Sequence, residues 1–381
     1  MANVFDYLYW RGDLSFKAAP FNPVDNIIFS IVSYLPLDNV VSGSDDPLPL
    51  PIAMKMLQEK EKKHPNIKRN YIFKDDETKI IGSLLNADRY KSVVLHSYIN
   101  KIDNLRKMQF SAVVINSPIC PAYIAFRGTD LTIAGWQEDF NMIFDKAIPA
   151  QIEAAKYLQH ASLTVRGKFN IGGHSKGGNL AIYAASFCTN AVQKRIANIY
   201  SNDSPGFSKE IVVQKEYKAI ENRICTFIPQ DSIVGLLFEH QKKYFVVQCD
   251  GIGFDQHNPF LWHITKDNFE RAPSITKYSK FLNKNLMDWL NGMNQTTRQH
   301  FINTLFGILN TTNVKSVPDF TDNWLENSAL LLKSMRDLDK STKDMLNKTF
   351  AAFVSVVVRN VRKTIISKVD AKKSEVVSKI K

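Results

Sequence analysis

The strongest chemical signal in the sequence is a serine that lies between two glycines. The stretch "IGGHSKGGNLAIYAA" covers residues 171–185 and places Ser175 between Gly173 and Gly177. The pattern G-x-S-x-G between a strand and a helix is typical of a nucleophile elbow, a tight turn that exposes the serine hydroxyl. Glycines two positions before and after the serine let the turn pass close to neighbouring backbone. We therefore expect Ser175 to be a nucleophile.

A nucleophilic serine needs a base, and the base needs an acid that orients it. In α/β-hydrolases the acid and then the histidine follow the serine, each on a loop after a later strand. Asp231 is preferred as the acid because it ends the second predicted strand after the elbow, and Asp203, which ends the first, is the alternative. His257 is preferred as the base because it lies in a turn-rich loop. His263, in an alternating apolar run, and His240 are the alternatives.

The third requirement is an oxyanion hole, a set of donors for the negative charge that develops on the carbonyl oxygen. One donor is expected to be the N–H of Lys176, the residue after the serine. The stretch "YIAFRGTDLTIAGWQEDF", residues 123–140, offers the other. Its predicted strand stops at Phe126, Gly128 allows a sharp turn, and Thr129 can present an N–H or a hydroxyl. His174, inside the elbow, is expected to pack rather than react, because adjacent side chains on such a turn diverge.

Strands alternate with helices through the middle of the chain, which predicts an α/β fold with a mostly parallel, doubly wound sheet. With the elbow, this order predicts an α/β-hydrolase domain with an N-terminal extension over residues 1–290, and a C-terminal helical, basic region over 291–381. Strands are expected at 110–118 and 121–126, as a hairpin, and at 168–173, 196–203, 222–230 and 242–250; helices are expected at 23–37, 53–65, 133–145 and 148–159, and after about residue 270.

Composition limits the class of protein. The 381 residues are 44% hydrophobic, which is ample for a sizeable core. The first residues do not have the basic and then apolar regions of a secretion signal, and no apolar run approaches the length of a membrane span. None of the four cysteines form a C-x-x-C pair, so we expect reduced thiols and a cytoplasmic protein. No His, Cys and Asp residues have the spacing of metal ligands, so neither a metal nor another cofactor is expected.

The C-terminal segment is a separate signal. Residues 333–381 hold thirteen Lys and Arg against five Asp and Glu, so they carry +8 of the net charge of +12. Apolar residues recur every three or four positions from Phe350 to Val369, as on an amphipathic helix. Such a helix could pack on the body of the protein, or bind an anionic membrane surface as a peripheral contact. Nucleic acid is disfavoured as a partner because the segment has no recognition motif beyond charge.

The combination "AFRGTD" and "GGHSKGGNLA" resembles the class 3 lipases, in which a similar segment supplies oxyanion contacts before a G-H-S-x-G-G elbow. The likeness is greater to a bacterial branch of these α/β-hydrolases that is classed as a domain of unknown function. The elements "NDSPGF" at 202–207, "DSIVG" at 231–235 and "QHNPFLW" at 256–262 match its pattern, as does "MANVFDYLYWRGDLSF" at the start. Ser204 stands where that pattern has glycine. The resemblance covers about residues 1–290 and implies a serine hydrolase fold with His257 as base.

One residue departs from the lipases that the sequence resembles. They usually carry an apolar residue after the nucleophile, and this chain has Lys176. Its ammonium could face the cleft and favour an anionic substrate, or it could point to solvent or pair with a carboxylate.

The sequence therefore predicts a serine hydrolase that cleaves a carboxylic ester, of a small molecule or a lipid, through an acyl-enzyme. A thioesterase, amidase or acyltransferase could use the same residues, and a non-catalytic binding protein could keep the fold.

Overall fold

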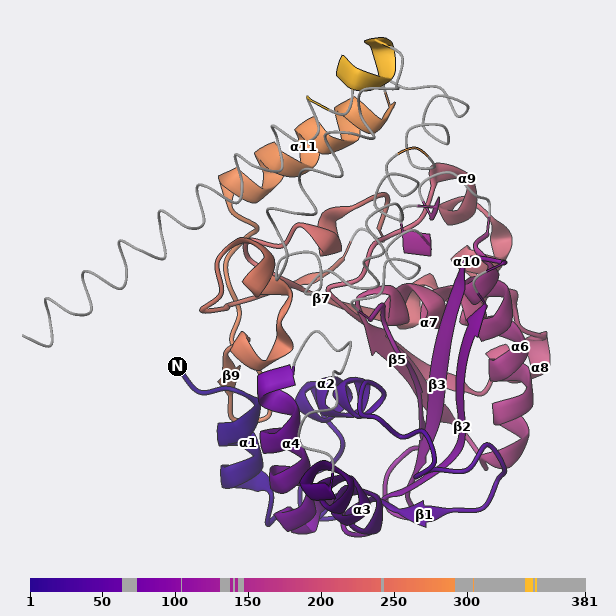
Figure 1. The fold of residues 1–381 in the computed structure, drawn as a ribbon, viewed down its shortest axis with the longest axis vertical. Helices are drawn as coiled ribbons and strands as arrows, with labels where there is room; N and C mark the ends of the chain where they lie inside the picture. Colours follow the sequence, from indigo (N-terminus) through magenta and orange to yellow (C-terminus); the bar gives the residue numbers. More distant parts are fainter. Residues whose placement is uncertain are drawn as a thin grey trace, which may run out of the picture.

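The computed structural model describes residues 1–63, 74–103, 105–130, 138–139, 141–142, 147–240 and 243–291, with 304, 340–344 and 347. These residues form an eight-stranded sheet with helices on both faces (Figure 1), so the predicted α/β fold is confirmed. The predicted apolar and basic stripe from Phe350 to Val369 lies outside the described residues, as does most of the helix predicted over 133–145.

The strands lie in the sheet in their order along the chain. The first four pair antiparallel, and β4 to β8 pair parallel. The predicted hairpin is confirmed as β3 and β4, whereas the long strand β2 was not predicted. The bounds are β1 (Leu48–Pro49), β2 (Val94–Asp103), β3 (Met108–Asn116), β4 (Tyr123–Phe126), β5 (Phe169–His174), β6 (Ile196–Asn202), β7 (Ile224–Pro229) and β8 (Phe245–Val247).

One face of the sheet is covered by the helices that connect the parallel strands. Because these strands follow one another in the same direction across the sheet, right-handed connections place all their helices on the same face. Ile124 and Phe126 of β4 point into this layer, where they pack with Ala181 and Leu180 of α7. The helices are α6 (Pro149–Thr164), α7 (Lys176–Phe187), α8 (Asn190–Gln193), α9 (Lys209–Val212) and α10 (Lys215–Lys218).

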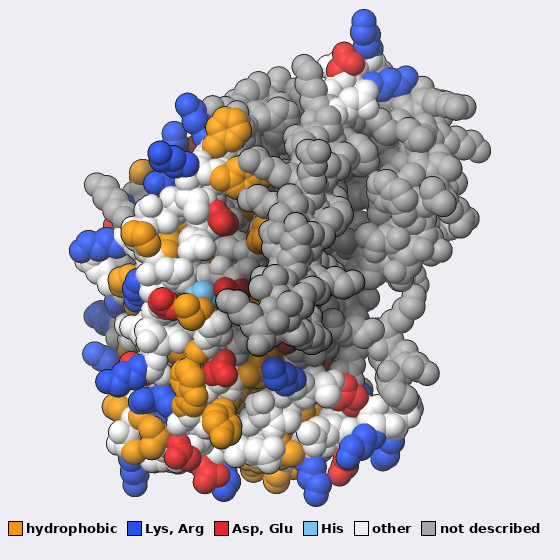
Figure 2. Space-filling view, turned by 90° about the vertical axis from the view of Figure 1, so that its left-hand side faces the viewer, with side chains coloured by type: hydrophobic (Ala, Val, Ile, Leu, Met, Phe, Trp, Pro, Cys, Tyr) orange, Lys and Arg blue, Asp and Glu red, His pale blue; other side chains and the backbone are white. Residues whose placement is uncertain are grey.

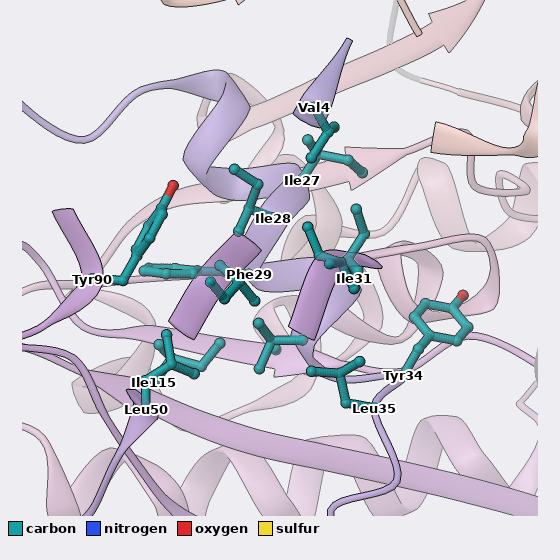
Figure 3. Close-up of a cluster of buried hydrophobic side chains, with 14 of the residues drawn as sticks. Val4, Ile27, Ile28, Phe29, Ile31, Tyr34, Leu35, Leu50, Tyr90 and Ile115 are labelled. Atoms are coloured by element: carbon teal, nitrogen blue, oxygen red, sulfur yellow. The ribbon is translucent and has the colours of Figure 1, made fainter. Parts of the chain in front are cut away.

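The other face is covered by the N-terminal helices, which gather in the lower part of Figure 1. They are α1 (Val4–Arg11), α2 (Pro23–Val32), α3 (Leu50–Lys63) and α4 (Lys74–Asn86). The side chain of Asn22 caps α2 by accepting from the N–H groups of Val24 and Asp25. Ile27, Ile28 and Phe29 of α2 pack into a core that Figure 3 shows between α2 and the sheet.

Smaller elements complete the described part of the chain. A two-stranded pair, β9 (Ile264–Thr265) and β10 (Asn268–Phe269), follows the main sheet, and α11 (Lys277–Asn291) extends beyond it at the upper left of Figure 1. On the face that Figure 2 shows, Lys and Arg are mixed with acidic and hydrophobic side chains. No helix among the described residues is long and apolar enough to span a bilayer.

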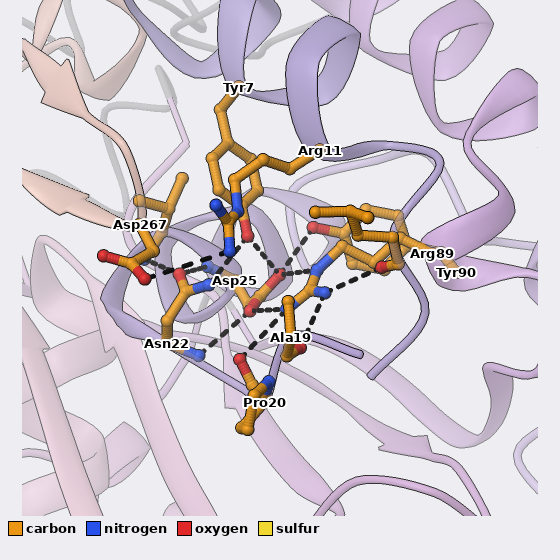
Figure 4. Close-up of polar contacts among 11 residues, drawn as sticks. Tyr7, Arg11, Ala19, Pro20, Asn22, Asp25, Arg89, Tyr90 and Asp267 are labelled. Carbon is orange, nitrogen blue, oxygen red and sulfur yellow. Dashed lines mark hydrogen bonds and ion pairs between the residues drawn. The ribbon is translucent and has the colours of Figure 1, made fainter. Parts of the chain in front are cut away.

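A buried ion pair holds the N-terminal helices together (Figure 4). Asp25 of α2 accepts from Arg89 through Nε at 2.8 Å and Nη2 at 2.6 Å, and both side chains are fully buried. The hydroxyls of Tyr7 and Tyr90 donate to the same carboxylate at 3.2 and 2.8 Å. Arg89 also donates to the carbonyls of Leu14, Ala19 and Pro20. The charges are thus compensated, and α1, α2 and the loop between them are tied to one centre.

Replacing Arg89 with methionine should leave the Asp25 carboxylate buried without a cation. Removing one partner of a buried pair typically costs about 3–5 kcal/mol, and we expect a loss of that order in the free energy of unfolding, measured by urea denaturation. Lys91→Met is the control, because its ion pair with Asp88 is exposed and exposed pairs contribute about 0–1 kcal/mol. Equal unfolding midpoints for the two variants would contradict this account of the N-terminal core.

Candidate active site

Ser175 lies on the turn between β5 and α7. Its backbone has φ 58° and ψ −137°, a conformation that residues with a side chain rarely adopt. Two backbone hydrogen bonds hold the turn: the N–H of Ser175 donates to the carbonyl of Asn202 at 3.0 Å, and the N–H of Gly178 donates to the carbonyl of Ser175 at 3.1 Å. The strand, the turn and the helix therefore occur as the G-x-S-x-G pattern predicted.

Close contacts around this turn leave no room for a side chain at three glycine positions. A Cβ atom on Gly177 would lie 2.1 Å from the carbonyl oxygen of Phe126, and one on Gly173 would lie 2.4 Å from the same oxygen. A Cβ atom on Gly128 would lie 2.9 Å from the Cβ of Ser175. The glycines thus allow the end of β4 and the loop after it to lie directly against the serine.

His257 is paired with a buried carboxylate. Its Nδ1 lies 2.6 Å from Oδ2 of Asp203, which is fully buried and directly follows β6. The other oxygen of Asp203 accepts from the hydroxyl of Ser232 at 2.5 Å and from the N–H of Gly235 at 3.1 Å. Because an ionised carboxylate only accepts hydrogen bonds, Nδ1 of His257 is assigned as the donor in this contact.

The preference for Asp231 as the partner of His257 is corrected by this contact. Asp231 follows β7 as predicted, but its carboxylate accepts from the hydroxyl of Thr276, and its N–H donates to Oε1 of Gln256 at 3.1 Å. Asp203 lies directly after β6 with its backbone in a left-handed conformation, φ 47°, and its carboxylate lies beside the loop that carries His257.

The alternative histidines lie in other surroundings. Nε2 of His263 lies 2.8 Å from Asp250, and its Nδ1 lies 3.5 Å from Glu270. Nε2 of His240 lies 3.1 Å from the carbonyl oxygen of Leu237, and burial lowers the pKa of this imidazole to about 4. The contact with Asp203 therefore favours His257 over both.

His174 supports the loop of His257, a contact that the sequence did not predict. It is fully buried, and burial followed by the nearby His257 holds its pKa well below the usual value. The imidazole is therefore neutral, and its Nε2–H donates to the backbone carbonyl of His257 at 2.8 Å. Its Nδ1 lies 3.2 Å from the hydroxyl of Tyr34. His174 is therefore packed, as expected, and it connects the elbow to the loop that carries His257.

The side chain of Lys176 is buried and pairs with carboxylates, so it does not point to solvent. Its Nζ donates to Glu138 at 2.9 Å and lies 3.6 Å from Asp139. Burial alone would lower the pKa of Lys176, but the two carboxylates outweigh it and raise the pKa. Asp139 also accepts from the hydroxyl of Thr129 at 2.5 Å. As the first residue of α7, Lys176 has an N–H without an intrahelical acceptor.

The geometry thus combines a serine at a helix N-terminus, a histidine whose Nδ1 is bound by a carboxylate, and a loop with backbone N–H groups beside the serine. Groups of these kinds occur in sites of acyl transfer. Among the residues that the structure describes, no group of three or more His, Cys, Asp and Glu side chains could hold a metal ion.

The eight-stranded sheet with helices on both faces defines an α/β protein. A family model described as Mbeg1-like matches residues 84–307, more than half of the chain, and the chain belongs to this lipase-like family. Among solved structures, the chain is similar to the native Rhizomucor miehei lipase propeptide complex, with 15% identity and a TM-score of 0.33 over 52% of this chain and 67% of that one.

A second structural match is M37 lipase, with 14% identity and a TM-score of 0.34 over 55% of this chain and 68% of that one. The comparison with curated proteins finds no match.

Asp139 should make the stability of the protein depend on pH. The side chain is 28% exposed, and its partial burial raises the pKa of this carboxyl from 3.8 to about 6, although Lys176 and Thr129 oppose the shift. A raised pKa means that the folded state holds the proton longer than the unfolded chain, so its stabilisation is present below about pH 4 and is lost as pH rises through about 6. We therefore expect the wild type to lose stability relative to Asp139→Asn between about pH 4 and about pH 7.

Urea unfolding of both proteins across this pH range measures the effect. Asp13→Asn, at an exposed position, is the matched control for loss of one carboxylate. A stability difference between wild type and Asp139→Asn that does not change with pH would contradict the raised pKa.

Proposed function

We propose that this protein is a serine hydrolase that cleaves carboxylic esters, with Ser175 as nucleophile, His257 as general base and Asp203 as the orienting acid. The observation that carries the proposal is the 2.6 Å contact between Nδ1 of His257 and the buried Asp203 carboxylate. Nδ1 is thereby protonated, and Nε2 is left as the basic atom. The lipase-like family of the chain supports a hydrolase of this type.

The proposed reaction has two halves. The hydroxyl oxygen of Ser175 attacks the acyl carbonyl while Nε2 of His257 takes its proton, and the tetrahedral intermediate then expels the alcohol, which receives that proton. Water attacks the acyl-enzyme by the same route and releases the acid. Asp203 stabilises the imidazolium, and its second oxygen is held by Ser232 and Gly235.

The N–H groups of Lys176 and Thr129 are the proposed oxyanion donors. The hydroxyl of Thr129 already donates to Asp139, so the backbone N–H is the donor that this residue offers. Lys176 contributes its N–H from the first turn of α7, where the helix dipole adds positive potential. Gly128 lies against Ser175, which supports a role for the adjacent Thr129 beside the nucleophile.

Replacing Ser175 with alanine should abolish labelling by a fluorophosphonate and turnover of short p-nitrophenyl esters, because no other nucleophile would remain in the elbow. The melting temperature should stay about the same, because the substitution removes only a hydroxyl and keeps the backbone of the turn. Hydrolysis of thioester and anilide analogues by the wild type would identify the acyl bond preferred. Full labelling of the alanine variant would disprove the assignment of the nucleophile.

The two aspartates provide a matched pair for the acid. Asp203→Asn should lower kcat by about 10²–10⁴-fold, because an amide at this position can donate to Nδ1 and favour the wrong tautomer of His257. Asp231→Asn should stay within about threefold of wild type, since its carboxylate contacts Thr276 and not the histidine. The opposite ranking of the two variants in steady-state assays would restore Asp231 as the acid.

A further inference from the structure

The side chain of Lys176 lies in a buried polar cluster next to the candidate active site. Its ammonium donates to Glu138 at 2.9 Å and to Gln109 through the backbone carbonyl at 3.2 Å and the side-chain oxygen at 3.3 Å. The side chains of Lys176 and Glu138 are both fully buried. Lysine is rarely buried to this extent, and a buried ion pair is often no more stabilising than apolar residues. Stability alone therefore does not account for a lysine at this position.

Glu138 joins this lysine of α7 to two other elements. Its Oε2 accepts from the N–H of Gln109 in β3 at 3.0 Å, in addition to the ammonium. Its Oε1 accepts from the N–H of Ala150, in the first turn of α6, at 3.0 Å. The carboxylate therefore has donors on both oxygens, and the start of α7 is fixed relative to β3 and α6.

Two further contacts lead from Lys176 to the loop after β4. Asp139, 3.6 Å from the ammonium, accepts from the hydroxyl of Thr129 at 2.5 Å. The side-chain oxygen of Gln109, which also receives the ammonium, accepts from the N–H of Asp130 at 3.4 Å. The two paths end on consecutive residues of the loop that contacts the serine.

We propose that Lys176 is a positioning residue, whose side chain fixes the loop of Thr129 relative to the N–H of Lys176 itself. This inference rests on the proposed function, in which these two residues supply the oxyanion donors. Such donors act only at about 2.7–3.1 Å from the developing charge, and a misplacement of about 1 Å can cost about 10²-fold in rate. An apolar residue at 176 would keep the N–H but lose the connection to the loop.

A double-mutant cycle on Lys176→Met and Asp139→Ala tests the proposal, with p-nitrophenyl butyrate as substrate. We expect Lys176→Met to lower kcat by about 10–100-fold with KM within about twofold, because a misplaced donor affects the transition state more than substrate binding. Asp139→Ala should lower kcat by the same mechanism. If Lys176 acts through Asp139, the double variant should be no slower than Lys176→Met, whereas independent effects would multiply.

Two further variants separate positioning from general loss of structure. Lys168→Met, at an exposed position, is the control and should keep wild-type kcat. Lys176→Arg keeps the charge but replaces a compact ammonium by a planar fork, so it should fold and still lower kcat at least about tenfold. It provides the test if Lys176→Met does not fold. The rate of fluorophosphonate labelling should fall in parallel, because the phosphonyl oxygen takes the place of the oxyanion.

The outcomes distinguish this inference from the function on which it rests. A wild type with neither turnover nor labelling would overturn the proposed function. An active wild type whose kcat is unchanged by Lys176→Met, or by Lys176→Arg if the methionine variant does not fold, would overturn only the positioning role. Multiplicative effects of Lys176→Met and Asp139→Ala would overturn the path through Asp139 and leave the path through Gln109 and Asp130.

Discussion

The geometry of the candidate site depends on how closely the end of β4 approaches the turn after β5. The carbonyl oxygen of Phe126 lies only 2.1 Å from where a Cβ on Gly177 would be, and Gly128 lies against Ser175. A non-glycine residue at positive φ costs about 1–3 kcal/mol and persists only where its surroundings determine it. Here hydrogen bonds to Asn202 and Gly178 hold the serine in that conformation. The hydroxyl, the helix N-terminus and the neighbouring loop are thus positioned by backbone contacts.

The N-terminal helices, on the other face of the sheet, also help to position the site. Asp25 anchors α2 through Arg89, and the next residue, Asn26, exchanges hydrogen bonds with Asn202, directly before Asp203. Tyr34, two residues after the end of α2, contacts His174, which supports the His257 loop. Buried polar networks with satisfied partners are rigid. The segment before β1 therefore contributes to the site as well as to the core.

Much of the fold could be predicted because it follows local patterns. The strand, turn and helix around Ser175 are encoded within the stretch 171–185, and the hairpin of β3 and β4 follows from apolar runs around a short turn. β2 escaped prediction because its pairing register shifts between His96 and Ile99, where a bulge interrupts the alternation that identifies a strand. β2 therefore had no complete local signal.

The sequence by itself determined which residues could react: one serine in an elbow, a histidine in a turn-rich loop, and two aspartates that each end a strand. Only the tertiary structure showed which aspartate contacts the histidine. Asp203 and Asp231 follow neighbouring parallel strands, so their local patterns are equivalent. The choice depends on where the loop of His257 returns to the sheet, a contact between residues 54 positions apart. The same reason applies to Lys176, whose partners Glu138 and Gln109 meet it only when β3, α6 and α7 pack together. Contacts of this kind arise from packing between elements, which spacing along the chain does not encode.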